Sequence, residues 1–505
     1  MATAKERFTK LDGRREQVLK RARDCAALTI PALMPPQGAD ENTELLTPYQ
    51  SLGARGLNNL ASKLRLSLFP AGNPFFKFKI DSDVLKLVAQ DSPEAAEQIE
   101  KAMQQLENDA LDELEQGSDA VILHSAIKQL IASGNALLHM PKDESSRVFR
   151  LTNYVVVRDA SGNWFEMVAQ EKVSKYTLPE GVVVSKPGKK DEDEDVVIYT
   201  HIEKDGDKAV WYQEVDEQKI PGSDGKSDYE NCPFIPLRWA ALENEDYGRG
   251  HCEEYLGDLR SLEDLSRDLI SFSAAAAKVI FLDRPNSTTD LAALQEAESG
   301  EFVEGNIEDI GVLQLNKYHD FQVVKSQIDD LSLRISHAFL LTTGTVRDAE
   351  RVTAEEIRMQ AQELEDVLGG VYTVLAAELQ QKVVRRLIER LKVKGLFPEL
   401  PKGAVKPVIV TGFAALGRGH ELNKLRQYFA DGVGIYGPTF MEEFQPGAVA
   451  DRLARDHNVD VEALRKTPEQ KQAETDAQTQ ANLVDKTAAP VAGAVAKGAM
   501  DAATQ

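Results

Sequence analysis

The chain has 505 residues, of which 42% are hydrophobic, so it is too long for a single core and is expected to form about two to four lobes. Its formal net charge of −23 excludes an overall basic surface that clamps nucleic acid by neutralising phosphates, although DNA can pass such a surface without adhering to it. Three cysteines, Cys25, Cys232 and Cys252, lie far apart without Cys-x-x-Cys spacing. They predict buried thiols in a reducing compartment, not a disulfide framework or a zinc site.

Two features argue against export and membrane insertion. The N-terminal segment through Asp24 is rich in charged residues, which is not the pattern of a signal peptide. The longest uncharged apolar stretches, residues 129–141 and 407–417, fall short of the roughly 20 residues that span a bilayer. We therefore expect no membrane partner.

The first third of the chain has mostly helical periodicity. Residues 5–30 predict one amphipathic helix, ended by Pro31, with Phe8, Leu11, Val18, Leu19, Ala22 and Cys25 inward. A helix over residues 47–64 should be followed by a strand at the aromatic run 74–78. Two more helices are expected at 93–117 and 118–134.

The pattern then changes to the period of two that strands show. Between Val148 and Val215 we predict one hairpin that turns at residues 159–163 and a second that turns at residues 204–206. The charged run at residues 189–195 between them is interpreted as a solvated loop.

A second group of helices follows. The spacing of apolar residues predicts a long helix from His251 to Leu282, a loop-rich insert from Asp283 to Phe321 and a helix over residues 325–340. The hydroxyl-rich loop at residues 341–351 carries two arginines, which fits either transient contact with a polyanion or a plain interhelical connection.

The most informative pattern is a helical stripe from Thr353 to Leu391, a rod of about 58 Å at 1.5 Å per residue. Thr353 and Glu356 form a capping box at its start, and Gly395 with Pro398 should end it. Gly369 and Gly370 predict a kink or a close backbone approach, unless two shorter helices meet there. Beyond the rod we expect a short strand at residues 408–412, helices to about Ala473, and a disordered or weakly helical tail.

The sequence offers little catalytic chemistry. It has no His-Glu-x-x-His or Gly-x-Ser-x-Gly motif, so we expect no enzyme. The glycines at 412–419 are followed by Arg-Gly where a phosphate loop needs Lys-Ser or Lys-Thr, and they are interpreted as a turn. His124 and His139 are expected to be packed or surface imidazoles. His251 lies beside Cys252, but no second pair of ligands exists to complete a metal site, so no metal or cofactor is predicted.

Several runs of sequence together carry a family resemblance. They are Thr47 to Leu64, Tyr247 to Arg249, Glu253 to Glu263, Glu350 to Arg358 and Leu368 to Tyr372. In this order, over roughly residues 5–470, they resemble the portal, or head-to-tail connector, proteins of short-tailed double-stranded DNA phages of the autographivirus type.

The resemblance implies a mainly α fold with a smaller α+β part, assembled as a ring with wing, helical stem, clip and crown. The parts would be the wing at residues 1–250, the first stem helix at 251–282, the clip at 283–324, the second stem helix at 325–340, the tunnel loop at 341–352, the long wing helix at 353–395, and the crown and C-terminal tail at 396–505. It also implies a homo-oligomer, typically of twelve subunits, at the portal vertex of the virion between head and tail, made in the host cytoplasm. Its partners would be double-stranded DNA bound without sequence specificity, the terminase large subunit, a tail adaptor protein, and the major capsid and scaffolding proteins.

On this pattern a set of residues would line the DNA channel. They are Thr342, Thr343, Gly344, Thr345, Arg347 and Arg351 in the tunnel loop, and Lys278, Lys325 and Arg334 in the stem. An acidic bore would repel phosphate while sparse rings of Lys or Arg hold DNA centrally. The alternative for these cations is salt bridging between subunits, and the alternative for the whole chain is a helical scaffold or adaptor of a large assembly.

Overall fold

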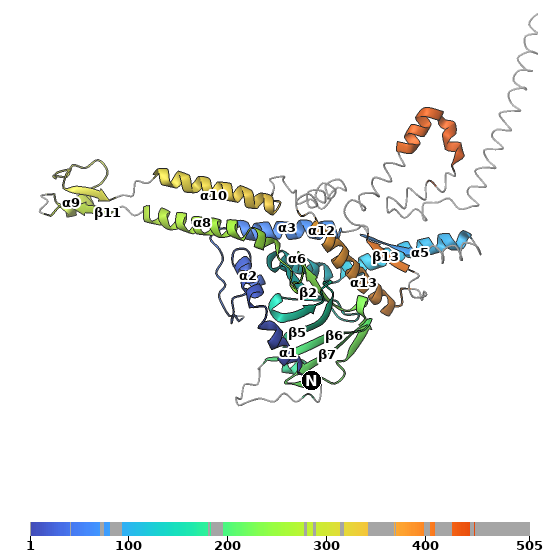
Figure 1. Ribbon diagram of the computed structural model, residues 1–505. Helices are drawn as coiled ribbons and strands as arrows, with labels where there is room; N and C mark the ends of the chain where they lie inside the picture. Colours follow the sequence, from blue (N-terminus) through green and yellow to red (C-terminus); the bar gives the residue numbers. More distant parts are fainter. Residues whose placement is uncertain are drawn as a thin grey trace, which may run out of the picture. The chain divides into compact units, whose positions relative to one another are not determined.

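The computed structural model (Figure 1) describes most of the chain in segments. They are residues 2–40, 42–70, 75–80, 93–179, 182, 195–276, 280–285, 289–313, 318–341, 368, 370–397, 405–409, 427–444 and 449. The chain divides into two compact units, Met1–Ala415 and Leu416–Gln505. Among the described helices, none combines the length and apolar character that crossing a membrane requires.

An antiparallel sheet in the order β4-β5-β6-β7-β8, with β9 also paired to β7, forms the β part of the first unit. Its strands are β4 (Tyr154–Arg158), β5 (Trp164–Ser174), β6 (Asp195–Asp205), β7 (Lys208–Val215), β8 (Gln218–Lys219) and β9 (Gly225–Asp228). β4 and β5 form the first predicted hairpin and β6 and β7 the second, so both predictions are confirmed. Because strand side chains alternate between faces, Met167 and Ala169 pack on one side of the sheet and Val168 on the other.

The N-terminal helix predicted over residues 5–30 is wrong as a single element. The structure has α1 (Ala4–Asp12) and α2 (Glu16–Ala27), separated at Gly13. The buried side chain of Arg15 holds this turn, since its Nε donates to Asp12 and its Nη1 donates to the carbonyl of Leu151 at 2.5 Å. Because of this break the two helices pack on opposite faces of the sheet. α1 packs against Val155 and Val168, and α2 packs on the face that carries Met167 and Ala169.

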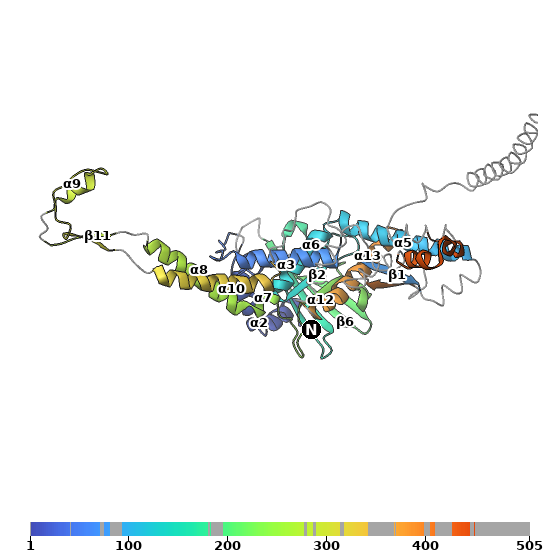
Figure 2. The same ribbon diagram turned by 90° about the horizontal axis from the view of Figure 1, so that it is seen from above.

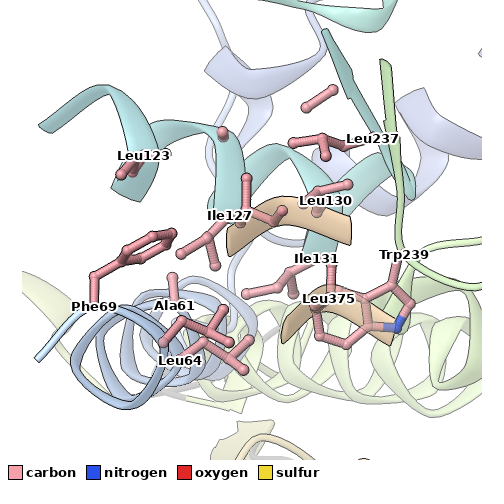
Figure 3. Close-up of a cluster of buried hydrophobic side chains, with 14 of the residues drawn as sticks. Ala61, Leu64, Phe69, Leu123, Ile127, Leu130, Ile131, Leu237, Trp239 and Leu375 are labelled. Carbon is pink, nitrogen blue, oxygen red and sulfur yellow. The ribbon is translucent and has the colours of Figure 1, made fainter. Parts of the chain in front are cut away.

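The main hydrophobic core lies among α3 (Leu52–Leu68), α5 (Pro93–Gln116) and α6 (Asp119–Ser133), close to their predicted positions. Figure 3 shows Ile127 of α6 directed toward Ala61 and Leu64 of α3. A second sheet packs beside them in the order β10-β2-β3. Its strands are β2 (Asn135–His139), β3 (Arg147–Phe149) and β10 (Phe234–Arg238).

Short elements complete this part of the chain. The strand expected at the aromatic run, residues 74–78, is β1 (Phe76–Ile80). It pairs antiparallel with β13 (Val405–Ile409), which begins before the predicted residues 408–412. The 3₁₀ turns are η1 (Pro31–Leu33), η2 (Leu151–Asn153), η3 (Lys175–Thr177) and η4 (Tyr229–Asn231).

The helix predicted from His251 to Leu282 is correct only in part. The structure has α7 (His251–Glu254) and α8 (Leu256–Ala276), whereas β11 (Ile280–Asp283) is a strand that pairs with β12 (Ile310–Leu313). A short apolar run fits the periodicity of a helix as well as that of a buried strand, and here the pairing with β12 decides. Between these strands lies α9 (Leu291–Glu296), and α10 (Tyr318–Ala338) begins seven residues before the predicted start at 325.

The described part of the long rod is one helical run made of α12 (Gly370–Leu375), a π segment labelled η5 (Ala376–Gln380) and α13 (Gln381–Val393). Its predicted stripe is confirmed where it is described, because Leu368, Leu375, Leu379, Val383, Leu387 and Leu391 are all buried. Apolar residues spaced four apart shift by about 40° per step around an α-helix, because four residues exceed one turn. A π turn contains more residues than an α turn, so the η5 segment rotates the stripe back and offsets part of this shift. Thr353, Glu356 and Gly369 lie outside the described residues, so the kink predicted at Gly369 and Gly370 stays a prediction. Gly370 begins α12, and a departure from α geometry comes six residues later, in η5.

The predicted stop at Gly395 is also confirmed. Gly395 has φ +71° and donates to the carbonyl of Lys392, while the amide of Leu396 donates to the carbonyl of Leu391 at 3.0 Å. This pair of bonds is a Schellman motif, in which a left-handed residue lets the chain satisfy the last helical carbonyls.

In the second unit the structure describes a helix at residues 427–436 followed by η6 (Pro438–Glu443). Phe440 contacts Tyr428 and Tyr436, and its ring would clash with a Cβ on Gly432. The predictions for residues 189–194, 412–419 and the tail beyond Ala473 lie outside the described residues.

Candidate functional site at the base of the α8–α10 pair

Helices α8 and α10 run side by side in opposite directions (Figures 1 and 2). Phe272 near the end of α8 contacts Phe321 near the start of α10 at 4.4 Å between ring centroids, and Asp258 near the start of α8 pairs with Arg334 at 3.5 Å. Among the described side chains of the pair, burial is confined to the end near the body of the unit, where Leu259 and Ile335 are covered. The rest of the pair therefore projects beyond the core.

The surface of this pair is acidic and partly apolar. α8 carries four carboxylates and two arginines, and α10 carries three aspartates against Lys325 and Arg334. Ile270, Val323 and Leu333 are each more than half exposed. An extended helix pair with uncovered aliphatic residues is typical of a surface that packs against another molecule.

The C-terminal end of α10 is held by polar side chains from two other helices. The side-chain amide of Asn59 donates to the carbonyls of Phe339 at 3.1 Å and Leu340 at 2.8 Å. Nζ of Lys63 donates to Leu340 at 3.0 Å, and Nε2 of His251 lies 2.9 Å from the carbonyl of Ala338. The last carbonyls of a helix lack intrahelical donors, and here α3 and α7 supply them. We call Asn59, Lys63 and His251 the α10 clamp.

Close side-chain packing also surrounds the clamp. His251 contacts the rings of Trp239, Tyr255 and Phe339, and burial lowers its pKa, which favours the neutral imidazole. Since a carbonyl can only accept, Nε2 carries the hydrogen. A Cβ placed on Gly56 would lie 2.8 Å from Phe339, so only glycine lets α3 approach this closely.

A second junction fixes α7 to the small sheet. Asn135 and Gly248 exchange two hydrogen bonds of 2.8 Å, and a Cβ on Gly134 would lie 2.5 Å from the amide nitrogen of Gly250. On α8, Glu263 accepts from the amides of Tyr49 and Gln50. Three of the sequence runs that carry the resemblance therefore meet at the base of the helix pair: Thr47 to Leu64, Tyr247 to Arg249 and Glu253 to Glu263.

Few of the channel candidates lie within the described part of the chain. Lys325 is exposed and makes no described ion pair, whereas Arg334 pairs with Asp258 of the same chain. They are nine residues apart, about two and a half turns of α10, so they project from opposite sides of the helix. Outside the described residues are Lys278, Thr342, Thr343, Gly344, Thr345, Arg347 and Arg351.

The buried thiols and the packed histidine at 139 are as predicted. Cys25, Cys232 and Cys252 are buried and free. His139 stacks on Phe234 with 4.2 Å between ring centroids, and burial lowers its pKa to about 3. In the part of the chain that the structure describes, no three His, Cys, Asp or Glu side chains are grouped as metal ligands would be.

Comparison with known proteins shows the class to which this architecture belongs. Residues 1–464 match the family described as bacteriophage head to tail connecting protein. The chain is 41% identical to the portal protein of Enterobacteria phage T3, over 93% of this chain and 89% of that protein. It is 40% identical to the portal protein of Escherichia phage T7, over 98% and 94% of the two chains.

The chain therefore belongs to the bacteriophage head-to-tail connecting protein family, and the predicted relationship to phage portal proteins is confirmed. Among solved structures, a chain in the neck of an empty GTA particle aligns with 13% identity and a TM-score of 0.38, over 74% of this chain and 84% of that one. A likeness this low adds nothing to the family assignment.

Proposed function

We propose that copies of this chain form a ring at one vertex of a phage head, and that double-stranded DNA passes through the ring during packaging and ejection. Membership of the portal-protein family supports this role. The observation that carries it is the α8–α10 pair, whose aliphatic residues Ile270, Val323 and Leu333 are uncovered in the single chain. Neighbouring copies packed around a channel, typically twelve, would cover them.

In this proposal the described elements take the parts of a portal subunit. The α8–α10 pair is the stem, the segment from β11 to β12 is the clip, and the preceding elements together with the α12–α13 run form the wing. The residues from 396 onward form the crown and tail. The α10 clamp then fixes the end of the stem from which the tunnel loop, residues 341–352, departs.

The charge of the channel follows from the same arrangement. Acidic stems repel the phosphates of DNA and prevent adhesion, and isolated cations keep the duplex centred. Of the two described stem candidates, Lys325 is the one available for this, because Arg334 is engaged with Asp258. The loop residues Arg347 and Arg351, and Lys278, are the remaining candidates.

The clip is the proposed docking surface for the terminase large subunit and then for the tail adaptor. Residues 280–313 carry eight carboxylates against Arg284 alone, and the side chains of Phe302 and Ile307 are almost fully exposed. A partner with basic side chains around an apolar recess would complement this surface. Contacts with the capsid and scaffolding proteins would lie on the wing and crown, at the portal vertex of the virion.

Electron microscopy of the purified full-length chain tests the ring. We expect closed rings for the wild type and loss of rings for Val323→Glu combined with Leu333→Glu. The matched control combines Leu242→Glu with Val121→Glu, which places the same two charges at exposed aliphatic residues outside the stem. Rings that persist with both stem substitutions, or that are lost equally in the control, would refute the proposed stem interface.

A further inference from the structure

A pocket of about 260 Å³ opens on the wing, at a distance in the fold from the α8–α10 pair. Its lining residues come from α13, β7, β9, η4 and the segment that follows β2. Its lining residues are Lys142, Lys208, Lys226, Ser227, Asp228, Asn231, Arg386 and Glu389. Its volume is several times the roughly 30 Å³ that a water molecule occupies, so it has room for a polyatomic ligand.

The charge of this pocket is opposite to that of the chain. Four cations and two carboxylates line it, in a protein of net charge −23. Glu389 is already engaged, because its two oxygens accept from Lys142 and Lys392 at 3.1 and 2.9 Å. Lys208 and Lys226 make no ion pair with any described residue, so their charge remains available to a ligand.

The wall of the pocket contains a buried guanidinium whose hydrogen bonds, among the described residues, go to neutral carbonyls. Arg386 is only 2% exposed, and it donates from Nε to the carbonyl of Met140 and from Nη1 to that of Asn231, both at 2.8 Å. Both of these acceptors are neutral carbonyls, and Glu389, the carboxylate of the same pocket that acts on Arg386 electrostatically, is already shared by Lys142 and Lys392. Burial lowers the pKa of Arg386, and the carboxylate of Glu389 offsets only part of this shift, which reflects the cost of burying the charge. An anion in the pocket would offset that cost.

We propose that this pocket binds a phosphate group, either free inorganic phosphate or a phosphate of the DNA backbone. Arginine offers a planar set of donors that matches phosphate oxygens, and lysines add charge from flexible stems. Arg386 would anchor the anion at the wall, Lys208 and Lys226 would close over it from β7 and β9, and the hydroxyl of Ser227 is available as a further donor. The site lies on elements other than the α8–α10 pair, so this proposal does not rest on the proposed stem interface.

Calorimetric titration of the full-length protein with inorganic phosphate, in chloride of matched ionic strength, tests the site. We expect one phosphate bound per chain, and an affinity lower by about ten- to a hundredfold when Lys208→Ala and Lys226→Ala are combined. The matched control combines Lys10→Ala with Lys172→Ala, which removes the same charge from exposed lysines elsewhere in the same unit. Arg386→Gln should abolish binding, and the lysine variants keep the test valid if that variant does not fold.

The source of the phosphate is resolved by competition. If a short DNA duplex displaces phosphate and binds less tightly to the Lys208→Ala and Lys226→Ala variant but not to the control, the ligand is the DNA backbone. If phosphate binds and the duplex does not displace it, the ligand is free phosphate. Absence of binding above the chloride baseline, or equal loss in the control variant, would overturn the proposal.

Discussion

The side chain of Asn59 in α3 donates to the carbonyl of Leu340 at 2.8 Å, where the chain leaves α10 with a φ of +54°. This bond and the second one to Phe339 satisfy carbonyls that the helix itself leaves without donors. Asn59→Ala should therefore destabilise the protein by about 1–3 kcal/mol, measured as a shift in thermal or denaturant unfolding. Asn58→Ala is the control, because Asn58 is exposed and should leave stability almost unchanged. Equal effects of the two substitutions would argue against the clamp.

The end of α13 depends on a buried ion pair. Nη1 of Arg390 lies 2.5 Å from Asp119, and its other nitrogens donate to Pro141, Glu144 and Ser146. Arg390→Met leaves Asp119 without its cation in the core, and we expect a loss of about 3–5 kcal/mol in unfolding free energy. Arg385→Met, on the same helix, breaks the pair with the exposed Glu230 and should cost about 0–1 kcal/mol. Similar losses for both variants would contradict this ranking.

The elements that were predictable from the sequence are those whose cause is local. The stripe from Leu368 to Leu391, the stop at Gly395 and both hairpins follow from periodicity and turn residues a few positions apart. The break at Gly13 was missed because the side chain that holds it, Arg15, bonds to Leu151, far along the chain.

The α10 clamp was missed for the same reason. Asn59 and Leu340 are 281 residues apart, and no spacing within one sequence reports that they meet. The runs that carried the family resemblance contained Asn59 and Lys63, and His251 lies between two of them, but the resemblance did not give these side chains a role. The strand β11 was not predicted, because Ile280, Phe281 and Leu282 fit a helical stripe as well as a strand until their pairing with β12 is known.

Two glycine substitutions should have opposite effects. Gly56→Ala places a methyl group 2.8 Å from Phe339, so α3 and α10 must separate, and we expect a loss of about 1–3 kcal/mol. Gly370→Ala lies in α12 with open space around it and should gain about 0.5–1 kcal/mol through higher helix propensity. Unfolding of the two variants under identical conditions measures the difference. A destabilising Gly370→Ala would show that the absence of a side chain matters at this position.

The attachment of the N-terminal helix should weaken in acid. Burial alone would raise the pKa of Glu166, but hydrogen bonds from Arg7 of α1 and from His201 outweigh it and lower the pKa from 4.5 to about 2. A carboxyl whose pKa is lower in the folded state stabilises that state above pH 4.5, and the contribution disappears as the pH falls toward 2. Glu166→Gln should therefore cost about 1.5–3 kcal/mol near neutral pH, and its difference from the wild type should shrink progressively below pH 4.5. Thermal unfolding of both proteins across this range measures the difference, and a gap that stays constant down to pH 2 would show that the Arg7–Glu166 contact does not hold α1 on the sheet.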